Sequence, residues 1–222
     1  DLAINKFGYS MLPRGFTLNA YRYLLNTPVQ LLNAYKVSIF VGIFGTAASL
    51  LITSGIAYVL SRKDYKYRRQ MSFFAFFPML FNAGLVPSYI VVSNYLHLKN
   101  TIFVLILPYL VMPMFVIILR TFMQKIPFEI VESCMVDGAS EYRIFFQVIM
   151  PLAKPGLATI ALFTLLNYWN DWWLAMLYIE KESLVPLQYM LARIMSQIEF
   201  LTSSTNTMPS SMKDLKVPTE SA

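Results

Sequence analysis

The sequence predicts an all-α integral membrane protein, a polytopic helical bundle with about four membrane spans in a single domain, residues 1–222. Of its 222 residues, 57% are hydrophobic and only 14% are charged, whereas a soluble domain carries roughly a quarter charged residues. The mean hydropathy is +0.53. The apolar residues also gather in runs long enough to cross a hydrocarbon core, which needs about 20 helical residues.

The first predicted span, residues 37–60, follows a segment, 1–36, that we place outside the membrane. This span is rich in small residues, which allow helices to approach closely in lipid. They are Gly42, Gly45, Ala47, Ala48, Gly55 and Ala57.

Three further spans are predicted at 71–94, 101–122 and 156–179, and prolines interrupt the first two of these. They are Pro78, Pro87, Pro108 and Pro113. Proline removes a helix hydrogen bond and kinks the helix, which membranes tolerate where a neighbouring helix or a water-filled cavity satisfies the freed carbonyl. The prolines indicate either a bundle that bends around a path or ordinary packing adjustments.

Basic residues orient the bundle, because cytoplasmic loops of membrane proteins carry an excess of Lys and Arg. The loop after the first span holds Arg62, Lys63, Lys66, Arg68 and Arg69 against Asp64 alone, and the region around loop 123–155 holds Arg120, Lys125, Arg143 and Lys154. The turn between the second and third spans has only His97 and Lys99. We therefore place both basic loops in the cytoplasm, and segment 1–36, the His97 turn and the tail 180–222 outside. An external N-terminus without a signal peptide predicts a fragment that originally followed another span.

The cytoplasmic loop is too polar to cross a bilayer and predicts two short helices over residues 126–155, joined at Asp137-Gly138. Pro127 suits a first helical turn, and Glu129 and Glu132 lie early in that helix, where the dipole favours acids. Gly138 can adopt the left-handed conformation that closes a helix. Ser140 is a candidate N-cap of the second helix, which Pro151 is expected to end.

The second helix carries an apolar stripe with i, i+3, i+4, i+7 spacing, formed by Tyr142, Phe145, Phe146 and Ile149. Such a stripe packs on its own bundle, lies in the membrane surface or enters a groove on a partner. Spacing alone favours packing on the protein's own spans.

The last span has a polar face formed by Asn167, Asn170 and Asp171, with Trp169, Trp172, Trp173 and Met176 nearly opposite. Acids inside a membrane face the bundle interior or a wet cavity. The polar face either lines a translocation path or holds helices together. For Trp172 and Trp173, the interfacial aromatic belt is favoured.

Several classes of site are not expected. One cysteine, Cys134, and one histidine, His97, give neither a disulfide framework nor a His or Cys metal cluster. The sequence has no phosphate-binding G-x-x-x-x-G-K-[ST] loop and no H-E-x-x-H or G-x-S-x-G motif. We predict no catalytic residue, no cofactor and no metal. The basic excess reflects membrane insertion rather than nucleic-acid binding.

The hairpin resembles the EAA loop of permease subunits of ATP-binding-cassette (ABC) importers. Their pattern is Glu-Ala-Ala, three residues, Gly, nine residues, then Ile-x-Leu-Pro. Here it reads Glu132-Ser133-Cys134, then Gly138, then Val148-Ile149-Met150-Pro151, and Asp137-Gly138-Ala139 and Pro155 are also similar. Ser133, Cys134, Val148 and Met150 depart from the pattern but are conservative in size.

The resemblance covers nearly the whole chain and extends to the carbohydrate-uptake branch, particularly oligosaccharide permeases. It rests on Gly84-Leu85-Val86-Pro87, Leu107-Pro108, Trp169-Asn170-Asp171-Trp172 and, near the start, Pro13-Arg14-Gly15-Phe16-Thr17-Leu18 with Tyr21. Relatives of this kind have about six spans, which implies that the first and last are missing here.

What the resemblance implies is a multi-pass subunit of the cell (inner or plasma) membrane that moves a carbohydrate. Its implied partners are a second permease, identical or not, two cytoplasmic ABC ATPases that bind the ATP, an extracytoplasmic solute-binding protein and lipid. The loop residues that would dock on an ATPase are Glu132, Asp137, Gly138, Ala139, Tyr142, Phe145, Phe146 and Pro151. The candidate substrate path is Asn167, Trp169, Asn170 and Asp171.

Other interpretations stay open. The loop motif is shared with importers of peptides, amino acids or ions. A scaffold could also use the hairpin to recruit a cytoplasmic protein without moving solute. A secondary transporter is disfavoured because it needs no docking hairpin.

Overall fold

The computed structural model describes residues 28–81 and 83–207, and every regular element in those ranges is helical. The predictions for Pro13-Arg14-Gly15-Phe16-Thr17-Leu18, for Tyr21 and for the end of the tail lie outside the described residues. The all-α class is confirmed.

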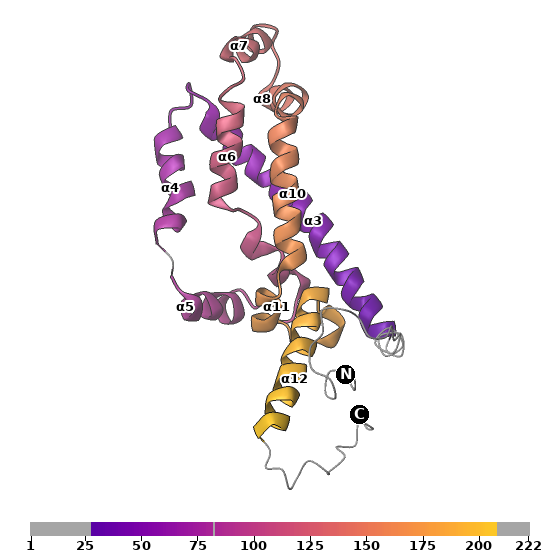
Figure 1. Cartoon of the computed structure of the whole chain (residues 1–222). Coiled ribbons are helices and arrows are strands. Elements are labelled where there is room, and N and C mark those ends of the chain that lie inside the picture. The colour runs from indigo at the N-terminus through magenta and orange to yellow at the C-terminus, as the bar shows by residue number, and fades with distance from the viewer. Residues whose placement is uncertain (1–27, 82, 208–222) are drawn as a thin grey trace.

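Three helices form the body of the bundle: α3 (Pro28–Ser61), α6 (Pro113–Met123) and α10 (Lys154–Asn170). Figure 1 shows them side by side, with α4 (Arg68–Leu80) beside α6. The turn after α3 and the loop after α6 lie at one end, which we call the hairpin end. The two basic loops therefore meet at the same end of the bundle, as their charge predicts.

The predicted close approach of small residues is confirmed between α3 and α10. A Cβ built on Gly42 would lie 3.3 Å from Leu165, and one on Gly45 would lie 2.8 Å from the ring of Tyr168. Real Cβ atoms essentially never show the 2.8 Å contact and rarely show the 3.3 Å one, so larger residues at these positions would force α10 or its side chains to shift. Helix α3 begins at Pro28 rather than near residue 37, so part of the predicted external segment is helical.

The second and third predicted spans are both interrupted, the second at Gly84 and the third between Tyr109 and Pro113, whereas Pro78 and Pro87 lie inside helices. The second comprises α4, α5 (Leu85–Ile90) and the π-helix η1 (Val91–Tyr95), with Gly84 at φ +85° before α5. The third comprises two 3₁₀ turns, η2 (Ile102–Leu105) and η3 (Leu107–Tyr109), followed by α6 after a 51° bend. Pro113 starts α6 instead of kinking it, since the first residue of a helix needs no N–H partner.

The fourth predicted span is not one helix. Helix α10 ends at Asn170, Asp171 is extended (φ −74°, ψ 117°), and α11 (Trp173–Tyr178) follows. Side chains before and after Asp171 therefore do not keep helical spacing, and the expected opposite face of Trp169, Trp172, Trp173 and Met176 is wrong as a continuous helical face.

Within the described residues, one helix has the length and composition of a membrane span by itself, 29–61. The number rises to as many as four if each pair of helices separated by a bend counts as one span. One of these pairs joins the second hairpin helix to α10 at 81°.

The end opposite the hairpin is held by the turn at Asn100, a residue with φ +59°. Its Oδ1 accepts hydrogen bonds from the backbone N–H groups of Glu180 (2.6 Å) and Lys181 (3.1 Å), and Lys99 Nζ pairs with Glu180 Oε1 at 2.6 Å. The 3₁₀ turn η5 (Glu182–Leu184) follows.

The predicted external tail contains a helix, α12 (Leu187–Thr207), that the sequence analysis did not anticipate. Its first N–H, on Leu187, donates to the buried Ser38 Oγ of α3 at 2.8 Å. In Figure 1, α5, α11 and α12 lie at this opposite end.

Candidate functional site

The hairpin forms at the residues that the sequence predicts. Helix α7 (Phe128–Val136) follows Pro127 and has Glu129 in its first turn. Gly138 has φ +75°, which confirms the left-handed turn. Ser140 caps α8 (Glu141–Arg143) by accepting a hydrogen bond from Arg143 N–H at 3.4 Å, which confirms the predicted N-cap.

Pro151 does not end the second helix, contrary to the prediction. The helix runs from α8 through the π-helical segment η4 (Ile144–Ile149) to α9 (Met150–Leu152). At the end of the π-segment, Met150 N–H bonds five residues back, to Phe145 O. The regular α-helical ladder is already interrupted before Pro151, so its missing N–H does not stop the helix there.

The π-segment also divides the predicted stripe. Phe145 and Ile149 are buried in the core that α3, α6 and α7 share with the hairpin, together with Ile144, which the stripe does not include. Phe146 is 50% exposed and Tyr142 is 79% exposed. The expectation of one common face is therefore wrong, because π-helical turns rotate successive side chains by a different angle from α-helical turns. Phe145 packs on Tyr58 of α3, with ring centroids 5.2 Å apart.

The outer surface of the hairpin is formed by the bend and by the exposed members of the stripe. Glu132, Asp137 and Gly138 are exposed, Ala139 is half-buried against the core, and Pro151 is exposed. Val136, beside the bend, is 87% exposed. Apolar and acidic side chains therefore stand together on a projecting surface.

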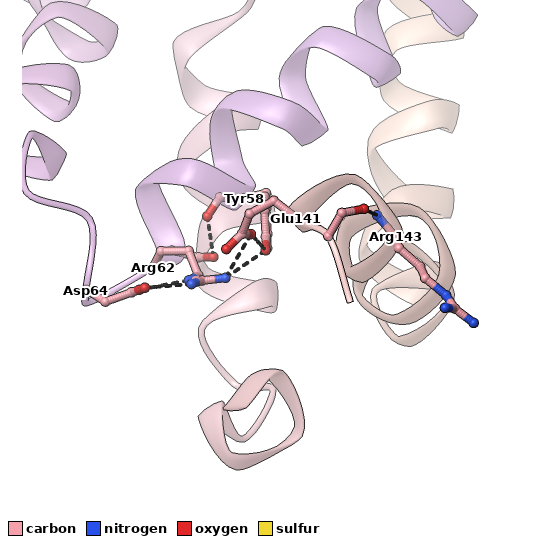
Figure 2. Close-up of polar contacts among 7 residues, drawn as sticks. Tyr58, Arg62, Asp64, Glu141 and Arg143 are labelled. Atoms are coloured by element: carbon pink, nitrogen blue, oxygen red, sulfur yellow. Dashed lines mark hydrogen bonds and ion pairs between the residues drawn. The ribbon is translucent and has the colours of Figure 1, made fainter. Parts of the chain in front are cut away.

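A polar joint centred on Arg62 ties the hairpin to α3 (Figure 2). Arg62 lies just after α3 and is 8% exposed. Its Nε and Nη2 donate to the two carboxylate oxygens of Asp64 at 2.8 and 2.6 Å. Its Nη1 donates to Tyr58 Oη at 2.8 Å and to Glu141 Oε2 at 3.1 Å. Tyr58 Oη in turn donates to Glu141 Oε2 at 2.6 Å.

The charges of this joint reinforce each other. Hydrogen bonds from Arg62 hold the pKa of the Asp64 carboxyl below its ordinary value of 3.8. The same hydrogen bonds raise the pKa of Arg62 further above its ordinary range. The guanidinium also lies over the ring of Phe128 in α7, 5.6 Å from its centroid. Arg62 thus contacts both hairpin helices and stays cationic.

The sequence analysis assigned Arg62 only to the positive cluster and missed Tyr58 and Glu141. A weak signal was present, because Tyr58 and Arg62 are four residues apart at the end of a helix and therefore share a face. Nothing in the sequence pairs either residue with Glu141, about 80 residues later in the chain.

A polar pocket lies where α10 breaks. It has a volume of about 310 Å³ and is lined by Tyr109, Phe163, Leu166, Asn167, Asn170 and Asp171. Tyr109 Oη donates to Asp171 Oδ1 at 3.0 Å, and Asp171 Oδ2 accepts from Leu174 N–H at 3.3 Å. The tyrosine hydroxyl, the two carboxamides and the carboxylate can hydrogen-bond a hydroxylated ligand.

The pocket brings together three of the four predicted path residues, although the break in the helix, not a continuous polar face, places Asp171 there. Trp169 does not line it, so the structure separates Trp169 from the other three. Tyr109 and Phe163 were missed, because neither residue type is distinctive in an apolar span. Trp172 and Trp173 pack edge to face at 5.9 Å, each 42% exposed. In the described ranges, no group of three His, Cys, Asp or Glu side chains is placed to hold a metal.

Comparison with known proteins decides the family. The family model described as "Binding-protein-dependent transport system inner membrane component" matches residues 68–208, which include both the hairpin and the pocket side chains of α10. The chain belongs to this family.

Relatives of known name share most of this chain. Protein LplC of Bacillus subtilis is 38% identical over 200 residues, which are 90% of this chain and 67% of LplC. The polygalacturonan/rhamnogalacturonan transport system permease protein YtcP of the same species is 38% identical over 186 residues, or 84% and 64% of the two chains. The chain thus spans about two thirds of the length of these relatives.

A solved structure has the same fold. It is the crystal structure of a bacterial ABC transporter involved in the import of the acidic polysaccharide alginate, and the superposition has a TM-score of 0.81 at 30% identity. The match covers 92% of this chain and 74% of that chain.

Proposed function

We propose that this chain is a permease subunit of an ATP-driven ABC importer, that it forms part of the path for a carbohydrate, and that cytoplasmic ATPases drive it through the hairpin. The observation that carries the proposal is the projecting hairpin, whose inner face is buried in the bundle while its outer face exposes apolar and acidic side chains. The chain would act with a second permease and an extracytoplasmic solute-binding protein, in the cell membrane.

The hairpin end is the end that would face the cytoplasm. Its two loop regions carry nine of the 18 Lys and Arg residues of the chain, and loops rich in Lys and Arg stay on the cytoplasmic side during insertion. A cytoplasmic ATPase would then meet Glu132, the Asp137-Gly138 bend, Tyr142 and Phe146. Phe145 is left out of this docking surface because its side chain is buried within the chain itself.

ATP hydrolysis is assigned to the partner. The chain has no phosphate-binding loop of the G-x-x-x-x-G-K-[ST] type. In this proposal the energy of ATP hydrolysis reaches the chain through contact with the ATPase. The hairpin is suited to this contact because it is exposed on its outer face and packed against the helices on its inner face.

A carbohydrate substrate is supported by two observations. Named relatives transport saccharides, among them the galactooligosaccharide permease protein GanQ and the arabinooligosaccharide permease protein AraQ of Bacillus subtilis. The polar pocket offers carboxamide and carboxylate groups beside the rings of Tyr109 and Phe163, a combination suited to hydroxyls and to the apolar faces of sugar rings.

The test is Phe146→Asp, expressed with the partner permease and the ATPases. A charge at this half-exposed position removes the apolar anchor without entering the core. We expect the variant to insert normally and to lose ATPase co-purification and ATP-driven uptake by tenfold or more, about 1.4 kcal/mol or above. Deleting the hairpin is a poorer test, since Ile144, Phe145 and Ile149 belong to the core.

Tyr67→Asp is the matched control. Tyr67 is also aromatic, is 53% exposed and lies at the hairpin end, but it belongs to the basic loop. We expect it to keep both the ATPases and the uptake. Normal uptake by Phe146→Asp would reject the proposal, as would equal losses in the two variants.

A further inference from the structure

The Arg62 joint lies at one end of the helix that runs the length of the bundle. Helix α3 has 34 residues, which at 1.5 Å per residue makes it about 50 Å long. Near its start, Ser38 holds the first N–H of α12. Near its end, Tyr58 and Arg62 hold Glu141 of the hairpin.

Between these ends, α3 lies directly against the part of α10 that carries the polar pocket. Gly45 faces the ring of Tyr168, and Gly42 faces Leu165. Tyr168 is adjacent in sequence to the pocket residue Asn167, and its hydroxyl donates to Ile106 O at 2.9 Å. A shift of α3 along or around its axis would therefore press on this turn of α10, because close contacts leave no room to absorb it.

The hairpin is not joined to α3 by dense packing alone. Two open pockets, of about 440 and 340 Å³, are both lined by Tyr58 and Arg62. The polar contacts of Arg62 and Tyr58 with Glu141 therefore add to the apolar contact between Tyr58 and Phe145. Arg62 suits this role because its planar fork contacts two carboxylates and a hydroxyl at once.

We propose that Arg62, through Tyr58 and Glu141, is the positioning residue that transmits movement of the hairpin to α3 and from there to the pocket segment of α10. This proposal rests on the proposed function, since it concerns how work from the ATPases reaches the path. Arg62 itself touches neither nucleotide nor substrate in it. Its contacts determine whether the hairpin and α3 move as one body.

The first measurement is substrate transported per ATP hydrolysed by the full complex in liposomes. In Arg62→Gln we expect the ATPases to stay bound and ATP hydrolysis to continue, while transport per ATP falls about tenfold, the size expected when a buried charged hydrogen-bond set loses its partner. Arg62→Lys keeps the charge but not the fork, and it should restore only part of the ratio.

Two milder variants keep the test valid if Arg62→Gln does not fold. Tyr58→Phe keeps the ring against Phe145 and removes only the hydroxyl, and Glu141→Gln keeps the shape of the side chain. Each variant should lower transport per ATP severalfold. The loss in the double variant should be smaller than the product of the two single losses, because the two residues share one contact. Arg143→Gln is the control, since the side chain of Arg143 bonds to Gln147 in its own helix.

The second measurement is independent of transport. Spin labels on Gln147→Cys in the hairpin and Ile43→Cys in α3, both exposed positions outside the docking surface, in a Cys134→Ser background, report the distance between the two elements. We expect one narrow distribution with and without ATP in the otherwise unchanged complex, and a broad one in Tyr58→Phe.

The outcomes separate the two proposals. A complex with native joint residues that shows no ATP-driven transport overturns the proposed function. A different result overturns the role of Arg62 alone. In that result the native complex transports normally, and Arg62→Gln, Tyr58→Phe and Glu141→Gln all keep the native ratio of transport to ATP hydrolysis and a narrow distance distribution.

Discussion

Gly45 lies so close to Tyr168 that a Cβ on it would stand 2.8 Å from two atoms of the ring. Tyr168 cannot swing away without losing its hydrogen bond to Ile106 O, and its side chain is 4% exposed. This contact sets the distance between α3 and α10, the two helices on which the pocket and the joint depend.

Gly45→Ala is expected to destabilise the protein. Overpacking at such a contact costs about 1–3 kcal/mol, which exceeds the roughly 0.5–1 kcal/mol gained when Ala replaces Gly inside a helix. Thermal unfolding in detergent measures the difference. Gly55→Ala is the matched control in the same helix, because a Cβ there meets nothing within 4 Å. It should be neutral or slightly stabilising, and equal effects at the two glycines would contradict the packing argument.

Asn100 should distinguish the cost of backbone conformation from the cost of lost hydrogen bonds. Asn100→Gly removes the bonds to Glu180 and Lys181 but accepts φ +59° without strain. Asn100→Ala removes the same bonds and adds the left-handed penalty of about 1–2 kcal/mol. We expect the melting temperature to be highest for the native protein, lower for Asn100→Gly and lowest for Asn100→Ala. If Ala equals Gly, the left-handed conformation does not carry the cost.

Asn167→Ala tests the pocket as a binding surface. Loss of one hydrogen bond to a ligand, about 0.5–1.5 kcal/mol, should raise the substrate concentration for half-maximal uptake by roughly two- to twelvefold. ATPase assembly should be unchanged. Thr159→Ala is the control, because Thr159 is an exposed residue of the same helix whose hydroxyl bonds only to Pro155 O in the structure. Half-maximal uptake that stays at the native concentration in Asn167→Ala would remove this side chain from the path.

The joint should be insensitive to pH across the physiological range. Arg62 lowers the pKa of Asp64 below 3.8 in the folded state. Asp64 therefore stabilises the folded state fully at a pH above its pKa in the unfolded chain, and this stabilisation is lost as the pH falls through its lower pKa in the folded state. The carboxylate is 46% exposed, so solvent screening limits the effect to about 1 kcal/mol or less. The melting temperature of Asp64→Asn should lie below native by a constant amount at pH 5–8, and the gap should narrow as the pH falls below about 4 and close below the folded pKa of Asp64. A gap that persists there would show that Asp64 acts through shape and not charge.

The local features of the hairpin could be predicted because they depend on neighbouring residues. A left-handed glycine at position 138 and a serine cap at position 140 are chemical properties of a few residues in sequence. The division of the stripe could not be predicted in the same way. Whether the helix after Ser140 is α- or π-helical is decided by the core into which Ile144, Phe145 and Ile149 pack, and that core includes α3 and α6.

The pocket also shows that sequence periodicity identifies single residues but not their partners on other helices. Asn167, Asn170 and Asp171 stand out in the sequence because polar residues in an apolar segment are costly unless water or another polar group meets them, and all three line the same pocket. Their partner Tyr109 is 62 residues away in sequence from Asp171. Helical periodicity cannot identify a partner on another helix.

The sequence alone determined that the chain is a helical membrane bundle, which loops share one end and where the hairpin bends, because hydropathy, charge and glycine or proline chemistry act over short stretches of chain. Tertiary structure alone decided that α10 stops at Asn170, that Phe145 faces inward, and that Arg62, Tyr58 and Glu141 meet. These outcomes depend on which residues from distant parts of the sequence pack beside each side chain. A buried charge or ring is stable only where such neighbours supply its hydrogen bonds or fill the space around it.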